Sequence, residues 1–560
     1  MIALKQLEER WGWYRHWIEE LAEEVERFLE ERKREEGKEE FVFNGGLSVS
    51  GLQHVGRLRG EVVIPEVVRR ILEARGWRIR QFITLYTQDA WKGKEPQCAQ
   101  FPDPREACGK YTGWPLIRVP DPKGCHDNWV DHYWEDFGPY LKDFTDGKVE
   151  VVTTTDLYRG SLLDFTRLSI EKREEIRKIL NKYRGRNPYP PGWIPFEPIC
   201  ARCGRIDTTE SIEIKGDTVV YKCKHCGYTG EAPLTEGKLN WRLEWVGVWW
   251  ALRVDFEPYG KDHAMPGGSR DSAKDLAVNV FRMKPPMGTP YEWVAYRDPA
   301  TGEETDMSSS DFKGFTPREW LEVAHPEVLR FLYLRVPPMR KVTLSLRDIP
   351  NYYNAWYQAE RIFYGAESTG DKEQDAHLAK SYFYSLLSWE NIPDKLPAQP
   401  PYTHVAILAW LLRKLDDNEA FEEALKRLQR TGHMPRDPTS YDVERLRALI
   451  PRARRWMEKY APSQMRVDIL EEPPSVELPD WVREKFEKAA SLLEALEDWN
   501  EENIKNALMK ATEDLDAKKR REFYRWFYKI FVGRDSGPRA APLLSLLDRN
   551  IVVKRLRLQA

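Results

Sequence analysis

The sequence has 560 residues, enough for roughly three to four folding units of about 150 residues each, so a small disulfide-held scaffold is excluded. Its 87 Lys and Arg residues nearly balance its 90 Asp and Glu residues, and total charge therefore does not indicate a nucleic-acid partner. The apolar stretches fall far short of the ~20 residues that cross a bilayer, and residues 1–10 lack a secretory signal, so we expect a cytoplasmic protein without membrane contact.

The N-terminal part predicts a strand, a turn, a helix and a second strand. Residues 1–40 are helical in pattern and highly charged, which predicts a leader helix exposed to solvent. An apolar run at 41–43 predicts a strand, and Asn-Gly-Gly at 44–46 predicts a turn. An amphipathic helix is expected from Arg57 to Ala74, and a second strand from Gln81 to Tyr86. This order is typical of a parallel nucleotide-binding sheet.

Further strands are expected at Val149–Thr153 and Val254–Phe256. Together with the first two they indicate an α/β domain of the Rossmann type, with its two halves at 41–190 and 236–345. A proline-rich stretch and a cysteine module separate the halves, and we interpret 191–235 as an insertion.

Four cysteines in the insertion have the spacing of a zinc ribbon. Cys200-x-x-Cys203 is followed, after nineteen residues, by Cys223-x-x-Cys226. Two such pairs can supply four thiolates to one tetrahedral Zn²⁺, and a closed site of this kind is structural. Two unrelated pairs of buried cysteines are the alternative. His225 lies between the ligands and is expected at the surface.

From residue 346 to 560 long helical periods replace the strand patterns and predict an all-α domain. The clearest periods lie at Val405–Leu415, Phe421–Leu428, Val443–Tyr460, Trp481–Trp499 and Asp516–Phe531, with a loop expected at 462–479. Basic runs near aromatic residues occur at 452–456, 518–521 and 554–557. They suit RNA phosphates and unstacked bases, and each is equally compatible with a solvated helix face.

The stretch from Ser50 to Arg57 lies between the first strand and its helix. Gly51 and Gly56 let the backbone approach a nucleotide, and a helix N-terminus favours negative charge. His54 could hydrogen-bond phosphate oxygens as they gain charge in a transition state. A single histidine in a turn is more often structural than catalytic.

This stretch resembles the HIGH signature of class I aminoacyl-tRNA synthetases, and 307–310 (Met-Ser-Ser-Ser) stand where their Lys-Met-Ser-Lys-Ser loop is expected. Residues 120–126 and 255–263 are similar to signatures of the archaeal-type class I lysyl-tRNA synthetases, although His126 itself is expected to be a packing residue. Further similar stretches follow at 432–437, 459–462, 537–539 and 554–558. The resemblance thus covers essentially the whole chain in the right order.

The resemblance implies a Rossmann catalytic domain split by a zinc-ribbon insertion, followed by a helical anticodon-binding domain at 346–560. The implied reaction activates lysine with ATP and Mg²⁺ to lysyl-adenylate and then transfers lysine to tRNA, most simply tRNA-Lys. By the same resemblance, the catalytic residues would be His54, Gly56, Ser308, Ser310 and Lys313. ATP or adenylate would contact Gly46, Gly51, Asp262 and His263, and the amino acid would contact Glu61 and Arg270.

The serine loop departs from the family's pattern in its charges. The family carries lysines on both sides of the loop core, where they neutralise the leaving pyrophosphate. Asp306 and Asp311 occupy the flanks in this chain, and Lys313 is the nearest substitute. Loss of such a cation lowers the rate by about 10² to 10³ in comparable sites.

The amino-acid site departs as well. Relatives place a glutamate directly after the arginine that follows the HIGH motif, whereas this chain has Arg59-Gly60-Glu61. One helical residue turns by about 100°, which leaves open whether Glu61 faces the pocket. Arg270 replaces an aromatic residue. A buried cation there would disfavour lysine; alternatively Arg270 points to solvent or pairs with Asp271.

Three functions are compatible with these patterns. The first is a working lysine–tRNA ligase with a remodelled loop. The second is a synthetase-like paralogue that binds tRNA or another RNA without activating lysine. The third is a ligase for a different amino acid.

Overall fold

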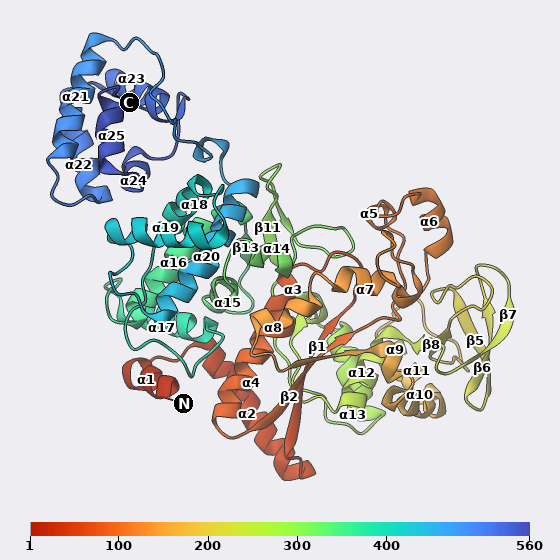
Figure 1. The fold of residues 1–560 in the computed structure, drawn as a ribbon. Coiled ribbons are helices and arrows are strands. Elements are labelled where there is room, and N and C mark those ends of the chain that lie inside the picture. The colour runs from red at the N-terminus through yellow and green to blue at the C-terminus, as the bar shows by residue number, and fades with distance from the viewer. Residues whose placement is uncertain (1, 560) are drawn as a thin grey trace. The chain divides into compact units, whose positions relative to one another are not determined.

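The computed structural model describes residues 2–559 (Figure 1). Contacts divide them into two compact units. The first contains the chain up to Glu319 together with Leu329–Leu344 and Asp371–Asn391, and the second contains Trp320–Val328, Ser345–Gly370 and the chain from Ile392 onward. Among the described residues, no helix is both long and apolar enough to span a membrane.

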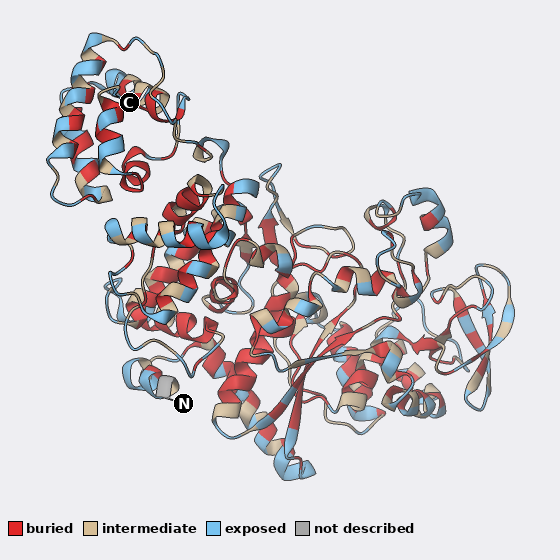
Figure 2. Cartoon of the chain, viewed as in Figure 1, coloured by how far each residue is buried: buried red, intermediate tan, exposed pale blue. Residues whose placement is uncertain are grey.

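The central sheet of the first unit is parallel, as predicted. It has the order β1 (Glu40–Leu47), β2 (Arg78–Leu85) and β3 (Val149–Thr153), with all neighbours parallel. Between β1 and β2 the chain forms α3 (Gly56–Leu58), a π-helical turn η1 (Arg59–Val63) and α4 (Ile64–Ala74). Buried residues dominate β1 and the helix beside it (Figure 2). The expected strand Val254–Phe256 is reduced to bridges of Phe256 with Phe43 and Met287.

The turn expected at 44–46 is wrong, because β1 continues to Leu47. The two glycines serve the packing of the strand instead. A Cβ at Gly45 would overlap the carbonyl oxygen of Glu61, and a Cβ at Gly46 would lie 2.9 Å from the ring of Tyr86. Only glycine lets the following helix and this tyrosine approach the strand so closely.

The expected exposed leader helix is also wrong. Two helices form there, α1 (Ile2–Trp11) and α2 (Trp17–Glu36), and α2 packs against α4. Its buried side chains include Ile18, Leu21, Val25 and Leu29, which recur at helical spacing on one face. The many charged residues that suggested full exposure are mostly confined to the rest of the helix surface.

The first unit contains further elements on either side of the insertion in the sequence. Before the insertion they are α5 (Glu95–Cys98), α6 (Pro104–Tyr111), η2 (Leu116–Arg118), α7 (Trp129–Trp134), η3 (Gly138–Tyr140), α8 (Leu141–Phe144), α9 (Thr154–Leu157), α10 (Ser161–Glu171) and α11 (Arg173–Asn181). After it come α12 (Trp241–Leu252), β9 (Tyr259–Gly260), η4 (Lys261–His263), α13 (Ser269–Asn279), β10 (Pro290–Tyr291), β11 (Val294–Arg297), β12 (Glu304–Asp306), β13 (Val342–Leu344) and α17 (Lys372–Ser385). Two helices, α14 (Pro317–Leu321) and α15 (Pro326–Leu334), have residues in both units.

The cysteine module is a small antiparallel sheet. Its strands are β5 (Thr209–Lys215), β6 (Thr218–Cys223) and β7 (Thr229–Pro233) in that order. An antiparallel pair of β4 (Phe196–Pro198) and β8 (Gly237–Leu239) joins the module to the rest of the unit.

The second unit is helical apart from its loops, in agreement with the predicted periods. Its elements are η5 (Leu346–Asp348), α16 (Ile349–Phe363), α18 (Tyr402–Leu411), α19 (Asp417–Arg430), α20 (Ser440–Lys459), η6 (Ser463–Met465), α21 (Asp480–Glu494), α22 (Glu501–Ala511), α23 (Ala517–Val532), α24 (Ala540–Ser545) and α25 (Arg549–Leu556). The expected loop at 462–479 is present and contains only the short turn η6.

A fully buried ion pair joins distant segments of the first unit. The Nη2 atom of Arg330 lies 2.9 Å from Oε2 of Glu66, and neither side chain is exposed. Arg330 also donates to the carbonyl oxygens of Ser385 and Phe144, at 2.9 and 2.7 Å. Arg70 is a second cation on Glu66, at 3.2 Å. Breaking such a pair leaves buried polar groups without partners.

We predict that Arg330→Met lowers the free energy of unfolding by about 3–5 kcal/mol, because the buried Glu66 keeps only Arg70 as a cation and the carbonyl groups of Ser385 and Phe144 lose their donor. The matched control is Arg80→Met, since the Arg80–Glu150 pair is about half exposed on both sides. That change should lower it by less than about 1 kcal/mol. Urea denaturation followed by tryptophan fluorescence measures both variants, and equal midpoints would contradict the prediction.

Candidate active site and metal sites

A cavity of about 650 Å³ lies at the carboxyl end of β1. Ligands of parallel α/β sheets bind at this end of the strands. The cavity brings together three segments that lie far apart in the sequence: the HIGH-like stretch, the 257–263 segment and the serine loop. Of the residues expected in the site, those in its wall are Gly46, His54, Gly56, Glu61, Asp262, His263, Ser308, Ser310 and Lys313. Gly51 and Arg270 are not in the wall.

Glu61 faces the cavity although it is displaced by one residue in the sequence. The π-helical turn Arg59–Val63 uses i→i+5 hydrogen bonds, so it takes up one residue more than an α-helical turn does. The carboxylate of Glu61 accepts hydrogen bonds from the backbone N–H of Gly46, at 2.9 Å, and from the hydroxyl of Tyr291.

The extra residue of this turn is glycine for a steric reason. A Cβ at Gly60 would overlap the ring of Tyr291. The tyrosine that holds Glu61 therefore packs where any larger residue at position 60 would stand.

Burial keeps Glu61 protonated near neutral pH. Burial raises its pKa to about 8, and the neighbouring carboxylate of Glu257 also raises it. The hydrogen bonds from Tyr291 and Gly46 act in the opposite direction without overcoming burial. A cation entering the cavity would favour the ionised form.

His54 is buried and lies in the cavity wall. Burial, and then the positive charge of Arg57, hold its pKa well below the usual value, so the imidazole is neutral. Its Nδ1 atom has no hydrogen-bond partner among residues 2–559. A Cβ at Gly56 would lie 2.9 Å from that atom, so this glycine leaves the imidazole its space.

The serine loop is a tight hairpin. Ser308 and Lys313 exchange two backbone hydrogen bonds of 2.9 Å, and Phe312 between them has a left-handed backbone. The loop rests on the HIGH-like stretch, because Gln53 donates to Oγ of Ser309 at 3.0 Å and a Cβ at Gly51 would meet the carbonyl oxygen of Ser309. Gly51 therefore supports the loop rather than lining the cavity.

Both aspartates of the loop have a lysine partner from another segment. The Nζ atom of Lys341 lies 3.1 Å from Oδ1 of Asp306. The Nζ atom of Lys94 lies 3.2 and 3.3 Å from the two oxygens of Asp311 and 2.9 Å from Oγ of Ser310. The charges that suggested repulsion of a polyphosphate are thus compensated on the protein itself.

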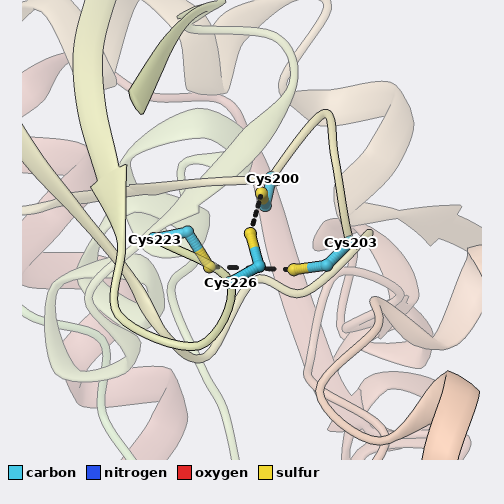
Figure 3. Close-up of side chains that lie close together, drawn as sticks. All are labelled: Cys200, Cys203, Cys223 and Cys226. Atoms are coloured by element: carbon cyan, nitrogen blue, oxygen red, sulfur yellow. Dashed lines mark hydrogen bonds between the residues drawn. The ribbon is translucent and has the colours of Figure 1, made fainter. Parts of the chain in front are cut away.

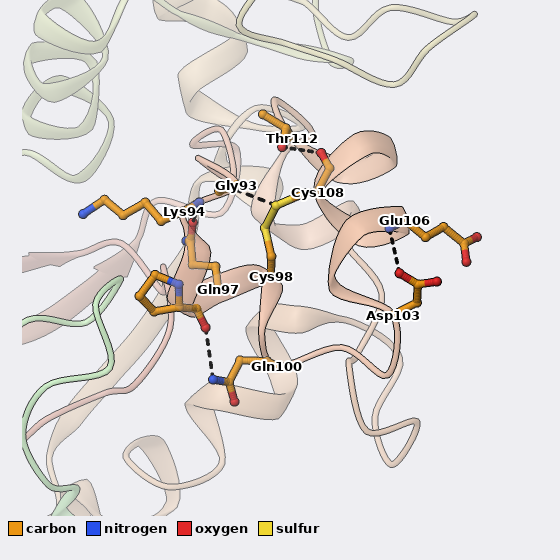
Figure 4. Close-up of a disulfide and its surroundings, with 10 residues drawn as sticks. Gly93, Lys94, Gln97, Cys98, Gln100, Asp103, Glu106, Cys108 and Thr112 are labelled. Carbon is orange, nitrogen blue, oxygen red and sulfur yellow. Dashed lines mark hydrogen bonds between the residues drawn. A yellow bond between two sulfur atoms is a disulfide. The ribbon is translucent and has the colours of Figure 1, made fainter.

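Lys94 was not expected from the sequence, since it precedes Ser310 by 216 residues. It stands at the start of α5, and its side chain points away from a disulfide between Cys98 and Cys108 (Figure 4). This disulfide, also unforeseen, joins α5 to α6. Gln97 of the same helix donates to the carbonyl oxygen of Ser50 at 2.8 Å, so α5 contacts both the loop and the HIGH-like stretch.

Arg270 lies behind the cavity wall. Its side chain is buried, its Nη2 atom donates to the carbonyl oxygen of Pro286 at 2.5 Å, and its guanidinium lies 4.9 Å from the ring of Trp249 and 4.8 Å from that of Tyr259. The expectations that it points to solvent or pairs with Asp271 are wrong, because Asp271 accepts a hydrogen bond from the backbone of Gly267. Packing against the rings of Trp249 and Tyr259 holds the Arg270 guanidinium in the protein interior.

The four cysteines of the insertion converge on one point (Figure 3). The sulfurs of Cys200 and Cys226 are 3.6 Å apart, and those of Cys203 and Cys223 are 3.7 Å apart. A tetrahedral Zn²⁺ with bonds of about 2.3 Å separates its sulfurs by about 3.8 Å, so the four thiols fit such an ion. His225 is exposed, as expected.

A second cluster with metal-ligand chemistry contains His126, which we expected to be a packing residue. Asp121, Cys125, His126 and His132 place one ligand atom each within 4.8 Å of one another. The sulfur of Cys125 lies 3.2 and 3.3 Å from Nδ1 of His126 and His132, and Nδ1 of His132 lies 3.0 Å from Oδ1 of Asp121. The spacing of these four residues within twelve positions was the signal that could have revealed the cluster.

Comparison with known proteins agrees with this geometry. The family described as class I tRNA synthetases (K) matches residues 15–386, and the anticodon-binding domain family matches residues 443–560. The lysine–tRNA ligase of Aeropyrum pernix is 53% identical over 549 residues, 97% of each chain. The lysine–tRNA ligases of Pyrococcus horikoshii and Methanosphaera stadtmanae are 34% and 30% identical, and each alignment covers 97% of this chain and 99% of theirs. The chain therefore belongs to the class I (K) family of tRNA synthetases.

Proposed function

We propose that this chain is a lysine–tRNA ligase, which activates lysine with ATP and transfers it to tRNA. The observation that carries the proposal is the buried carboxyl of Glu61, which faces a cavity shared by His54 and the serine loop. Similarity to lysine–tRNA ligases over 97% of the chain supports the same function. Three of the residues that favoured a paralogue or a different substrate have contacts compatible with lysine activation: Gly60 makes room for Tyr291, and Asp306 and Asp311 pair with lysines.

Selection of lysine would depend on Glu61. The ε-ammonium of lysine would pair with its carboxylate and replace the proton that burial places there. A neutral or acidic amino acid brings no cation to pair with Glu61, and the charge of an acidic one would in addition be desolvated in a cavity lined by the carboxyl groups of Glu61 and Glu257. Arg270 would not contact the substrate directly, because its guanidinium lies behind the ring of Tyr259.

In the first step the carboxylate of lysine would attack the α-phosphorus of ATP. A P–O bond forms to the amino acid, and the bond to the bridging oxygen of pyrophosphate breaks. The neutral His54 can donate one N–H to a phosphate oxygen, while Gly46 and Gly56 leave room for the nucleotide. Mg²⁺ would be held by the phosphates and offset their charge. In the second step a hydroxyl of the terminal adenosine of tRNA attacks the activated carbonyl and AMP leaves.

Neutralisation of the leaving pyrophosphate would fall to Lys94 and Lys313. Lys313 lies in the cavity wall, and Lys94 contacts Ser310 at the tip of the loop. When a polyphosphate enters, Lys94 can exchange Asp311 for a phosphate oxygen without leaving the loop. Two lysines from separate segments would thus replace the two that flank the loop in relatives.

Contact with tRNA would use the second unit, part of which matches the anticodon-binding domain family. Of the three basic runs, 518–521 is exposed at the start of α23 and forms no ion pair among the described residues. In the 452–456 run, Arg454 and Arg455 pair with acidic residues. Arg555 of the third run is buried and donates to backbone carbonyl groups. The 518–521 run is therefore the best candidate for phosphate contact.

Zinc would have structural roles. Cys200, Cys203, Cys223 and Cys226 would hold one ion that stiffens the β5–β7 insertion. Asp121, Cys125, His126 and His132 have the donor set of a second zinc site.

The proposed reaction is tested by ATP–pyrophosphate exchange with each of the twenty amino acids. We expect lysine to support exchange far above the others, because its ε-ammonium pairs with the carboxylate of Glu61. Exchange with lysine that stays at the background of a reaction without amino acid would contradict a ligase, and exchange with another amino acid alone would identify a different substrate.

We predict that lysine binds more tightly as the pH rises toward 8. Glu61 holds a proton below its pKa of about 8, so bound lysine must displace that proton. The dissociation constant should then fall about tenfold per pH unit between pH 6 and 8 and level off above that. Glu61→Gln should abolish this slope and weaken lysine binding about 10- to 100-fold, with ATP affinity unchanged as the control. Calorimetry at several pH values measures the dissociation constant of lysine. An equal slope in the variant would refute the assignment of Glu61 as the group that binds the ε-ammonium.

We predict that Lys94→Ala lowers kcat for exchange by about 10² to 10³, because one cation on the pyrophosphate is lost. The KM for lysine should change little, since Lys94 contacts the loop and not the Glu61 side of the cavity. Lys92→Ala is the matched control, as Lys92 is exposed two residues earlier. If both variants turn over like the unmodified chain, Lys94 has no role in the reaction.

A further inference from the structure

Three helical segments of the second unit meet at a histidine pair. His404 lies in α18, His433 follows the end of α19, and Glu501 is the first residue of α22. The two imidazole rings are 4.6 Å apart, and Nε2 of His404 lies 2.9 Å from Oε2 of Glu501. One ligand atom of each residue lies within 4.8 Å of the others.

The two imidazoles are left without hydrogen bonds at this point. The Nε2 atoms of His404 and His433 are both buried and have no hydrogen-bond partner among the described residues. The contact of His404 with Glu501 is short enough for a hydrogen bond but does not have the geometry of one. Buried polar atoms without partners are rare, and each requires an explanation such as an ion.

We propose that His404, His433 and Glu501 bind a divalent transition-metal ion of the Zn²⁺ type, which joins α18 and the end of α19 to α22. Imidazole and carboxylate are ligands that zinc accepts, and three protein ligands leave a fourth position for water. Glu501 is 38% exposed, so the ion and its water can enter from the solvent side. Burial lowers the pKa of both histidines to about 4, which keeps them in the neutral form that binds metals.

The position of the site gives it a structural role. His404 and His433 lie between residues 386 and 443, where the synthetase match has ended and the anticodon-domain match has not begun. Glu501 lies within the second match. The ion would therefore fasten the connecting helices to the anticodon-binding domain. The inference does not depend on the proposed ligase reaction.

The test is the zinc content of the full chain after saturation with Zn²⁺ and gel filtration, measured by mass spectrometry of the metal. The variant His433→Gln with Glu501→Gln removes two of the three ligands and should lose one zinc ion per chain. Glu502→Gln is the matched control, because Glu502 is an exposed neighbour in the same helix, and it should keep the full content. Glu501→Gln alone is a second variant, which changes a partly exposed side chain and keeps both histidines; it should also bind less zinc than Glu502→Gln.

Zinc content equal in the unmodified chain, the double variant and Glu502→Gln would overturn the proposal. Loss of one ion in the double variant, with the exchange reaction at its normal rate, would support the site and separate it from the active site. The midpoint of thermal unfolding should also rise on zinc addition less in Glu501→Gln than in Glu502→Gln, because an ion that binds only the folded chain stabilises it.

Discussion

The close packing of a helical turn on β1 is the constraint on which the candidate active site depends. The carbonyl oxygen of Glu61 lies where a side chain at Gly45 would begin, so the turn rests directly on the strand. At this distance the carboxylate of Glu61 reaches the backbone N–H of Gly46, and Tyr291 closes over it from the other side. A substrate cation would thus meet a carboxyl group whose position is set by backbone contacts and whose charge is set by burial.

The charges around the cavity are balanced across distant segments. Asp306 and Asp311 are paired with Lys341 and Lys94, which belong to neither the serine loop nor the HIGH-like stretch. Lys94 in turn depends on α5, which the Cys98–Cys108 disulfide joins to α6. The electrostatics of the loop are therefore a property of the folded unit, because ion pairs of this kind require the tertiary structure to bring their partners together.

Local patterns in the sequence predicted much of the fold and part of the site. The parallel order of β1, β2 and β3, the ribbon cysteines and the HIGH-like stretch follow from spacing and periodicity over short distances. The pairing of Lys94 with Asp311 could not be predicted, because it joins positions 217 residues apart. The prediction of an exposed leader helix was wrong for a related reason. The charge of α2 is visible in the sequence, but the surface that buries its apolar face is supplied by α4.

The π-helical turn at Arg59–Val63 bears on how such proteins are compared with one another. An inserted residue ordinarily rotates everything that follows it in a helix, yet here the wider turn confines the change to a single loop of backbone. The position of Glu61 in the sequence then differs by one residue from the position that its side chain takes in space. The resemblance leads one to expect the glutamate directly after Arg59, where this chain has glycine, whereas the carboxyl group of Glu61 is at the cavity. Substrate preference in this family is therefore better judged from which atoms reach the cavity than from which letter occupies a column.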